Sequence, residues 1–156
     1  MAWDDNIENV FCFMYNDVDE VSVMEYTVCD KKLIVGSGTV EICYADVLNI
    51  FVDEDLEEIQ LPPTVRVIHD NTFFGFPSVK RINIPNDVQY IGERSFWGLD
   101  DLKEVTLPIS VPFIGKHAFC NCTKLILTIV GNSSDVPSGW DKEFAANIKE
   151  IRFQNK

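Results

Sequence analysis

A step of 23 residues recurs along this chain and limits what it can fold into. It aligns three segments that each end in proline: LEEIQLP from residue 56, VKRINIP from residue 79 and LKEVTLP from residue 102. Internal periods of about 20 to 50 residues are typical of repeat architectures. Because one such unit cannot bury its apolar side chains alone, the period predicts coils that stack on each other and share one core.

Further apolar positions keep the same step and predict what fills that core. Each unit opens with alternating apolar and polar residues, which favours a short strand with one buried face. A proline ends the strand because it has no N–H for the ladder. Strands of successive coils should then pair in parallel, and one phenylalanine per coil should form a spine along the axis. The columns are Val65, Val88 and Val111; Ile68, Ile91 and Ile114; Phe73, Phe96 and Phe119; and Phe76, Leu99 and Cys122.

Written as LKEVTLPxxVxxIGxxAFxxCxxL, the unit resembles the leucine-rich repeat of the bacterial surface-antigen type, also called BspA-like or Treponema-type. The match is carried by Val111, Ile114, Phe119, Cys122 and Leu125, among others. The resemblance implies a right-handed leucine-rich-repeat solenoid, mainly β, with a parallel sheet on one side and irregular or 3-10 turns on the other. It also implies protein–protein binding, often by secreted or cell-surface proteins.

The N-terminal part departs from the repeat. We expect residues 1–35 to form an acidic β-meander that caps the first coil, and residues 36–156 to form the solenoid, within a single structural domain. Turn-forming residues separate three strand-like runs in the cap. These runs cover residues 10–15, 21–28 and 33–35.

The outermost coils of the solenoid are degenerate, as terminal repeats usually are. In the first, the 23-residue step aligns Ile42 with Val65 and Ile50 with Phe73. In the last, residues 141–147 are expected to form a short helix, and Trp140 and Phe144 to plug the open end.

One segment of the repeat and one pair of rings stay ambiguous. The alternation in residues 125–130 leaves either Ile126 or Leu127 facing outward, which favours a shift of register over an apolar contact patch. Phe74 and Trp97 are also 23 residues apart and are expected to stack, either in the core or as a partner anchor.

Charge is distributed unevenly along the chain, whose net charge is −12. Residues 1–58 contain 15 acids against Lys31 and Lys32, whereas residues 59–156 contain 10 acids against 11 bases. The negative electrostatic field of the first third repels nucleic acid and anionic membranes and attracts a basic partner. The same charge also increases solubility. No apolar run reaches the roughly 18 residues that a membrane span needs.

The sequence offers little for catalysis, and we expect neither an enzyme nor a cofactor or metal site. His69 and His117 occupy different positions of the repeat and do not align across coils, which argues against a catalytic pair. The cysteines are odd in number and lack a zinc-site spacing, so they are interpreted as reduced. They are Cys12, Cys29, Cys43, Cys120 and Cys122.

The start of the chain lacks a basic segment followed by an apolar one, so a cytoplasmic location is expected, or a cell-surface or secreted one if a leader was removed. Function is expected to be non-enzymatic protein binding through the sheet face and the acidic N-terminal third. Two alternatives stay open: an acidic inhibitor or nucleic-acid mimic of the phage or anti-CRISPR kind, and a fragment of a surface adhesin. Self-association through an uncapped end stays open as well.

The residues predicted to meet a partner are the outward positions of the repeat strands and one acidic turn. They are Glu57, Glu58, Gln60, Lys80, Arg81, Asn83, Lys103, Glu104, Thr106, Asp53, Glu54 and Asp55, with Lys149, Glu150 and Arg152 ending the row.

Overall fold

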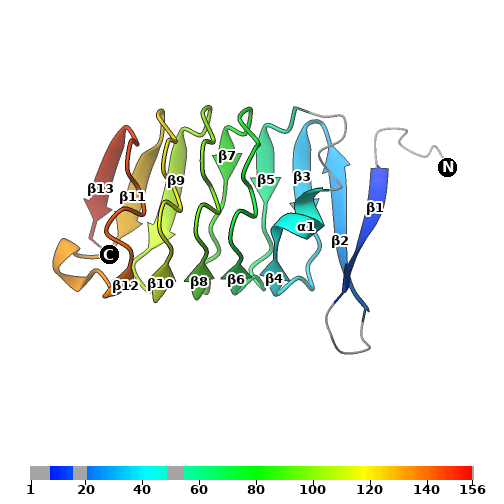
Figure 1. Cartoon of the computed structure of the whole chain (residues 1–156), viewed down its shortest axis with the longest axis horizontal. Helices are drawn as coiled ribbons and strands as arrows, with labels where there is room; N and C mark the ends of the chain where they lie inside the picture. The colour runs from blue at the N-terminus through cyan, green and yellow to red at the C-terminus, as the bar shows by residue number, and fades with distance from the viewer. Residues whose placement is uncertain (1–7, 16–20, 49–54, 156) are drawn as a thin grey trace.

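The computed structural model describes residues 8–15, 21–48 and 55–155, with side chains from residue 25 onward. It is a solenoid whose coils stack along one axis and contribute strands to two sheets (Figure 1). The sequence therefore predicted the fold class correctly. Ile50, which the 23-residue step aligned with Phe73, lies outside the described residues. So do Asp53 and Glu54, two of the residues predicted to meet a partner.

The larger sheet has eight strands and forms one wall of the solenoid. Its first three strands are antiparallel, as expected of a meander, and the strands from β3 onward pair in parallel. The strand order is β1 (Glu8–Tyr15), β2 (Val21–Cys29), β3 (Lys32–Val35), β5 (Glu58–Gln60), β7 (Arg81–Ile82), β9 (Glu104–Pro108), β11 (Ile126–Val130) and β13 (Glu150–Gln154).

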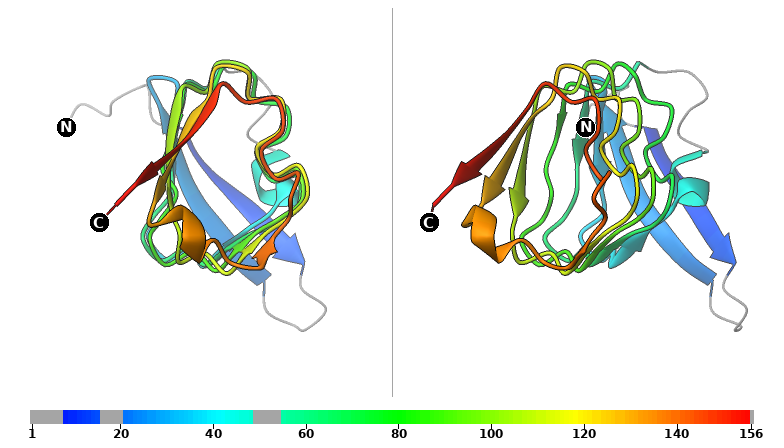
Figure 2. Two further views of the ribbon diagram at one scale, coloured as in Figure 1. Left: turned by 90° about the vertical axis from the view of Figure 1, so that its left-hand side faces the viewer. Right: turned by 60° about the vertical axis from the view of Figure 1, so that its left-hand side comes forward.

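A second, parallel sheet contributes one two-residue strand per coil, and the coils superpose when viewed along the axis (Figure 2). The only helical elements of the described chain are the five-residue α1 (Tyr44–Leu48) and the 3-10 turn η1 (Ser133–Asp135). The strands are β4 (Glu41–Ile42), β6 (Val67–Ile68), β8 (Tyr90–Ile91), β10 (Phe113–Ile114) and β12 (Gly139–Trp140).

The interior is a single apolar core built from the columns of the repeat. Its phenylalanines stack as predicted: the ring centroids are 5.4 Å apart for Phe73 and Phe96 and 4.8 Å apart for Phe96 and Phe119. All three rings are fully buried. At the end of the stack, Trp140 occupies the isoleucine column and donates its Nε1–H to the carbonyl of Val111 at 2.7 Å.

The turns repeat as regularly as the core. Two positions per coil have a positive φ, a conformation that non-glycine residues adopt only at a cost. Gly92 and Gly115 serve another purpose, because a Cβ at Gly92 would lie 2.4 Å from the amide nitrogen of Asp70 in the neighbouring coil. The positive-φ positions are Asn71, Arg94 and His117, and Gly75, Gly98 and Asn121.

The first coil is longer than the 23-residue step assumes, so the alignment of Ile42 with Val65 is wrong. Ile42 pairs with Ile68, a step of 26, whereas Ile68 pairs with Ile91, a step of 23. Leu33 likewise pairs with Ile59 across 26 residues. The extra three residues lie between β4 and β5, where they leave both sheets in register.

A shift of register occurs at β11, as the sequence favoured. Val105 pairs with Leu127, a step of 22, and Leu127 pairs with Ile151, a step of 24. Leu127 is therefore buried and Ile126 faces outward. The coil between β9 and β11 is one residue shorter than the others, and the shift of register keeps the apolar column inside the sheet unbroken.

Two smaller predictions are wrong. Residues 141–147 form turns instead of a helix, because each stretch of this chain bonds to the coil before it: the amide of Phe119 donates to the carbonyl of Phe144 at 2.7 Å. Phe74 and Trp97 do not stack on each other. Trp97 lies edge-on to His117, with centroids 5.4 Å apart, and Phe74 is 44% exposed.

Candidate protein-binding face

The outer face of the eight-stranded sheet presents two parallel rows of side chains, because alternate residues of each strand point away from the core. The first row is charged over the first four coils, and the second is uncharged until its last member. The charged row is Lys32, Glu58, Arg81, Glu104, Ile126 and Glu150, and the uncharged row is Ile34, Gln60, Asn83, Thr106, Thr128 and Arg152.

The charged row contains a ladder of ion pairs that runs from Lys32 through Glu58 to Arg81. Glu58 lies 2.9 Å from the Nζ of Lys32 and 3.0 Å from a guanidinium nitrogen of Arg81. Glu57, which precedes the same strand, bonds Lys80 at 2.8 Å and Lys31 at 3.2 Å. These hydrogen bonds, chiefly from Lys80 to Glu57 and from Lys32 to Glu58, hold the pKa of both carboxyls below its usual value.

The sheet face is therefore not the acidic surface that the whole chain suggests. Among the residues of its parallel strands, β3 to β13, and those directly before them, seven bases stand against four acids, a net of +3 in a chain of −12. On the meander, Glu25 lies on β2 and Asp30 follows it, which lowers the net charge of the described face to +1. The seven bases are Lys31, Lys32, Lys80, Arg81, Lys103, Lys149 and Arg152, and the four acids are Glu57, Glu58, Glu104 and Glu150.

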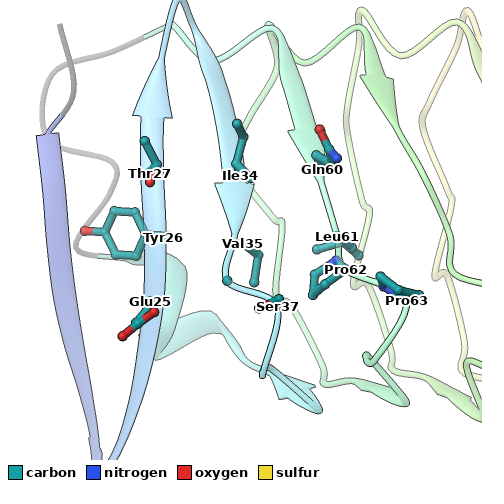
Figure 3. A pocket seen from close by; sticks show the side chains of 11 residues that line it. Glu25, Tyr26, Thr27, Ile34, Val35, Ser37, Gln60, Leu61, Pro62 and Pro63 are labelled. Carbon is teal, nitrogen blue, oxygen red and sulfur yellow. The ribbon is translucent and has the colours of Figure 1, made fainter. Parts of the chain in front are cut away.

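The uncharged row is hollowed in two places that share Gln60. One depression, of about 590 Å³, lies over β5, β7 and β9 and is lined by Gln60, Asn83 and Thr106, among others. The other, of about 510 Å³, lies where the meander meets the first coil, between Ile34 and Pro62 (Figure 3). Gln60 and Ile34 are exposed here. Together the depressions form a shallow track along the uncharged row. Glu58, Arg81 and Glu104 also line the larger depression, and Glu25 lines the smaller one.

Asn83 has a structural role within this track. Its Oδ1 accepts the amide N–H of Leu61 at 2.8 Å, and its Nδ2 donates to the carbonyl of Leu61 at 2.9 Å. The side chain thus replaces a pair of ladder bonds beyond the end of the short β7. Its amide groups are already occupied, which leaves Gln60 and Thr106 as the more available polar side chains.

The structure thus brings nine of the twelve residues predicted to meet a partner onto one face. Asp55, which is exposed, precedes β5, and the other two lie outside the described residues. Sequence reasoning missed Lys31, Lys32 and Ile34, which extend both rows onto β3. The 23-residue step could not reveal them, because β3 stands 26 residues before β5. A search that allowed longer steps would have found them.

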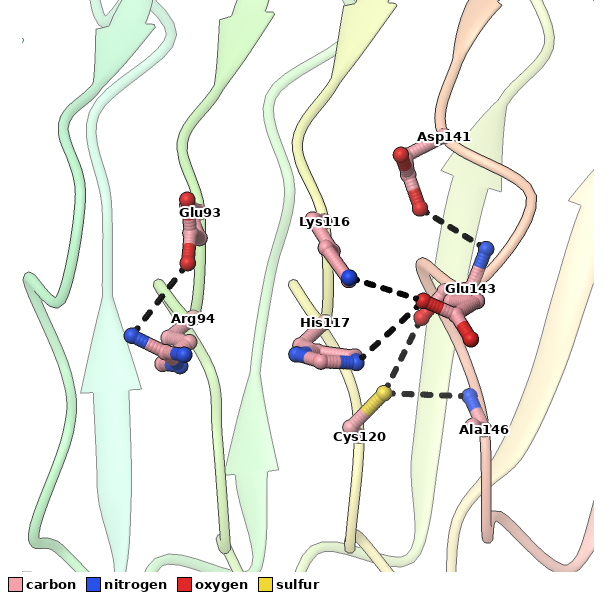
Figure 4. Close-up of polar contacts among 8 residues, drawn as sticks. All are labelled: Glu93, Arg94, Lys116, His117, Cys120, Asp141, Glu143 and Ala146. Atoms are coloured by element: carbon pink, nitrogen blue, oxygen red, sulfur yellow. Dashed lines mark hydrogen bonds and ion pairs between the residues drawn. The ribbon is translucent and has the colours of Figure 1, made fainter.

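A second polar cluster lies on the turns near the C-terminal end, where Glu143 is the hub (Figure 4). Its carboxylate lies 3.1 Å from the Nζ of Lys116 and 3.7 Å from the Nε2 of His117. The thiol of Cys120 donates to the backbone carbonyl of Glu143 at 3.0 Å and accepts the amide N–H of Ala146 at 3.2 Å.

This cluster does not have the arrangement of a catalytic centre. Cys120 is buried, and its burial raises the pKa of the thiol. The thiol is bonded to backbone groups rather than to His117, whereas a nucleophile needs a base within hydrogen-bond reach. Cys122 is buried deeper, and desolvation raises the pKa of its thiol to about 12. Both cysteines therefore act as core and turn residues.

Within the described ranges, no group of three or more His, Cys, Asp and Glu side chains is placed to hold a metal ion. Among the described side chains, Cys120 and Cys122 are free thiols. None of the helices seen in these ranges has the length and apolar character needed to cross a membrane.

Comparison with known proteins agrees with this architecture. Residues 48–156 match the model of the BspA type leucine rich repeat region, with six copies. No curated protein and no solved structure matches the chain. The family match covers more than half of the sequence and includes the last, degenerate coil as well as the three regular ones. The chain therefore belongs to the BspA-type leucine-rich repeat family.

Proposed function

We propose that the chain is a non-enzymatic protein-binding module that docks its partner on the outer face of the eight-stranded sheet. The observation that carries this proposal is the shallow track along the uncharged row at Gln60 and Thr106, which begins beside the ion pairs of Glu58. Leucine-rich repeat modules generally bind other proteins, and stacked strands offer a wide, rigid surface for such contacts.

The charges of this face bear on the kind of partner. Glu57 and Glu58 are neutralised by cations within the chain, so they are poorly placed to attract a basic surface. With a net of +1 on the described part of the face, a neutral partner fits better than a basic enzyme groove. This argument favours a general interaction module over an acidic inhibitor, whose charge would have to come from other residues of the N-terminal third.

Site-specific photo-crosslinking tests the proposal. A photoreactive amino acid at Gln60 or at Thr106 should capture the same protein from an extract of the source cells. The same probe at Gln89, which is exposed beside β8 on the other sheet, is the matched control and should not capture it. Capture from Gln89 but from neither sheet position would contradict the assignment of the face.

Once the partner is identified, Gln60→Arg and Thr106→Arg should each weaken its binding by on the order of tenfold, because a bulky charge would fill the track. Biolayer interferometry with the purified partner measures this change. Gln89→Arg should leave the affinity unchanged. Equal affinity for all three variants would place the binding surface elsewhere.

A further inference from the structure

The last strand of the large sheet leaves apolar side chains uncovered. Ile151 and Phe153 continue the two inner columns of the sheet, in register with Leu127 and Ile129 of β11. Leu127 and Ile129 are 0% and 1% exposed, whereas Ile151 and Phe153 are 42% and 43% exposed. β13 is also the edge strand of the sheet, and in the part of the chain that the structure describes no strand pairs with its outer backbone groups.

The hydrogen bonds of β13 determine which residues face that edge. The amide of Glu150 donates to the carbonyl of Leu125, so Glu150 and Arg152 direct their backbone groups toward β11. Backbone direction alternates along a strand. Ile151 and Phe153 therefore direct their N–H and C=O groups toward the free edge.

We propose that β13 pairs with β13 of a second copy in antiparallel fashion, about a twofold axis that passes through Ile151. This register places Ile151 opposite Ile151 in a hydrogen-bonded pair, as the direction of the backbone groups requires. It also places Glu150 opposite Arg152 of the second copy, and Arg152 opposite Glu150, on the outer face. Each charged residue thus meets its opposite, and the apolar column continues across the interface.

The antiparallel register displaced by one residue is less favourable. A shift that centres the pair on Arg152 brings two guanidinium groups together, and like charges directly opposite each other destabilise a sheet. Within one chain Arg152 already makes two bonds to Glu150, at 2.7 and 2.8 Å. In the proposed register these two residues and their copies form a row of alternating charge.

The distribution of charge favours a second copy as the occupant of this end. β1 and β13 lie at opposite ends of the long axis (Figure 1). Residues 1–58 carry a net −13, while residues 59–156 carry a net +1. Pairing through β13 keeps the two acidic ends far apart, well beyond the roughly 8 Å over which charges interact at physiological ionic strength. The small area of one strand pair predicts a dimer that dissociates on dilution.

Sedimentation velocity of the 156-residue chain tests the proposal over the micromolar concentration range. A concentration-dependent dimer is expected for the native chain. Ile151→Lys should abolish the dimer, because it places two ammonium groups at the twofold axis. Thr106→Arg, on the outer face of the same sheet and away from the edge, is the control and should leave dimerisation intact. A native chain that stays monomeric, or an Ile151→Lys variant that still dimerises, would overturn the proposal.

A charge exchange tests the register itself. Glu150→Arg and Arg152→Glu should each remove the dimer, because each gives an edge of one sign. An equimolar mixture of the two variants should form a heterodimer, since residue 150 of one then faces an opposite charge at residue 152 of the other. Failure of the mixture to associate, with circular dichroism showing that both variants are folded, would refute the pairing through Ile151.

Discussion

At the scale of single residues, the buried phenylalanines contribute most to the stability of the core. Each ring of the spine is fully buried and stacks on the ring of the next coil. The sequence predicted these contacts because Phe73, Phe96 and Phe119 share one step. Its prediction for Phe74 was wrong, because the 23-residue step to Trp97 does not determine which way a side chain on a turn points.

Removing the central ring should therefore be costly. Phe96→Ala is expected to lower the free energy of unfolding by about 3–5 kcal/mol, since it leaves a cavity between two rings. Phe74→Ala, the exposed neighbour of the first ring, is the matched control and should cost about 1 kcal/mol or less. Urea unfolding followed by circular dichroism measures both values. Equal losses would mean that the spine is not a special feature of the core.

At the scale of elements, the regular strands could be predicted and the turns could not. A strand is indicated by alternating apolar residues, and this signal survives even at β11, where the step shortens to 22. The turns depend on backbone geometry, which leaves a weak trace in the sequence: Arg94 and His117 occupy positive-φ positions that glycine or asparagine would usually take. The candidate face was predicted in the same way: its residues on the repeat strands were found, and those at β3 of the meander were missed.

The two kinds of turn glycine should respond differently to substitution. A Cβ at Gly98 meets nothing within 4 Å, but the residue has a φ of +68°, so Gly98→Ala should cost roughly 1–2 kcal/mol. Gly92→Ala should cost more, because its Cβ would collide with the backbone of Asp70.

Gly38→Ala is the control for both glycine substitutions, since a Cβ there meets nothing within 4 Å and no positive φ is involved. Its free energy of unfolding should stay within about 0.5 kcal/mol of the native value. Urea titration of the three variants measures their free energies of unfolding and so gives the order of their stabilities. A Gly92→Ala protein as stable as the Gly38→Ala protein would show that neighbouring coils are not in such close contact.

At the scale of the whole molecule, acid and base are separated in a way that composition alone conceals. The chain carries −12, yet the cations gather on the outer sheet face and neutralise the acids there. The sequence analysis located the acid in the first third, and the 23-residue step aligned Glu58 with Arg81, but it did not place a base of the meander beside Glu57 or Glu58. It could not anticipate their pairing with Lys31 and Lys32, because that contact depends on the 26-residue step of the first coil.

This pairing makes part of the stability depend on pH. The pKa values of Glu57 and Glu58 are lower in the folded chain than the usual 4.5, so the unfolded chain takes up protons first as the pH falls. Their contribution is fully present above about pH 4.5 and is lost as the pH falls through the folded values. The double variant Glu57→Gln, Glu58→Gln should be less stable than the native chain at neutral pH.

Urea unfolding at several pH values measures this effect, and the difference between the two proteins should shrink below about pH 4.5. Glu104→Gln is a suitable control, because Glu104 is exposed on the same face and makes no ion pair within the described ranges. A stability difference that stays constant with pH would contradict an electrostatic origin.

The longer first coil also has a practical consequence. Between Ile42 and Ile59 the chain accommodates three residues more than its neighbours do, and Ile42 and Leu33 still pair with the next coil. A foreign peptide inserted near Leu48 would therefore be carried by a rigid support without disturbing either wall. The molecule could serve in this way as a scaffold for displaying epitopes, with the insertion site separate from the surface through which it meets its own partner.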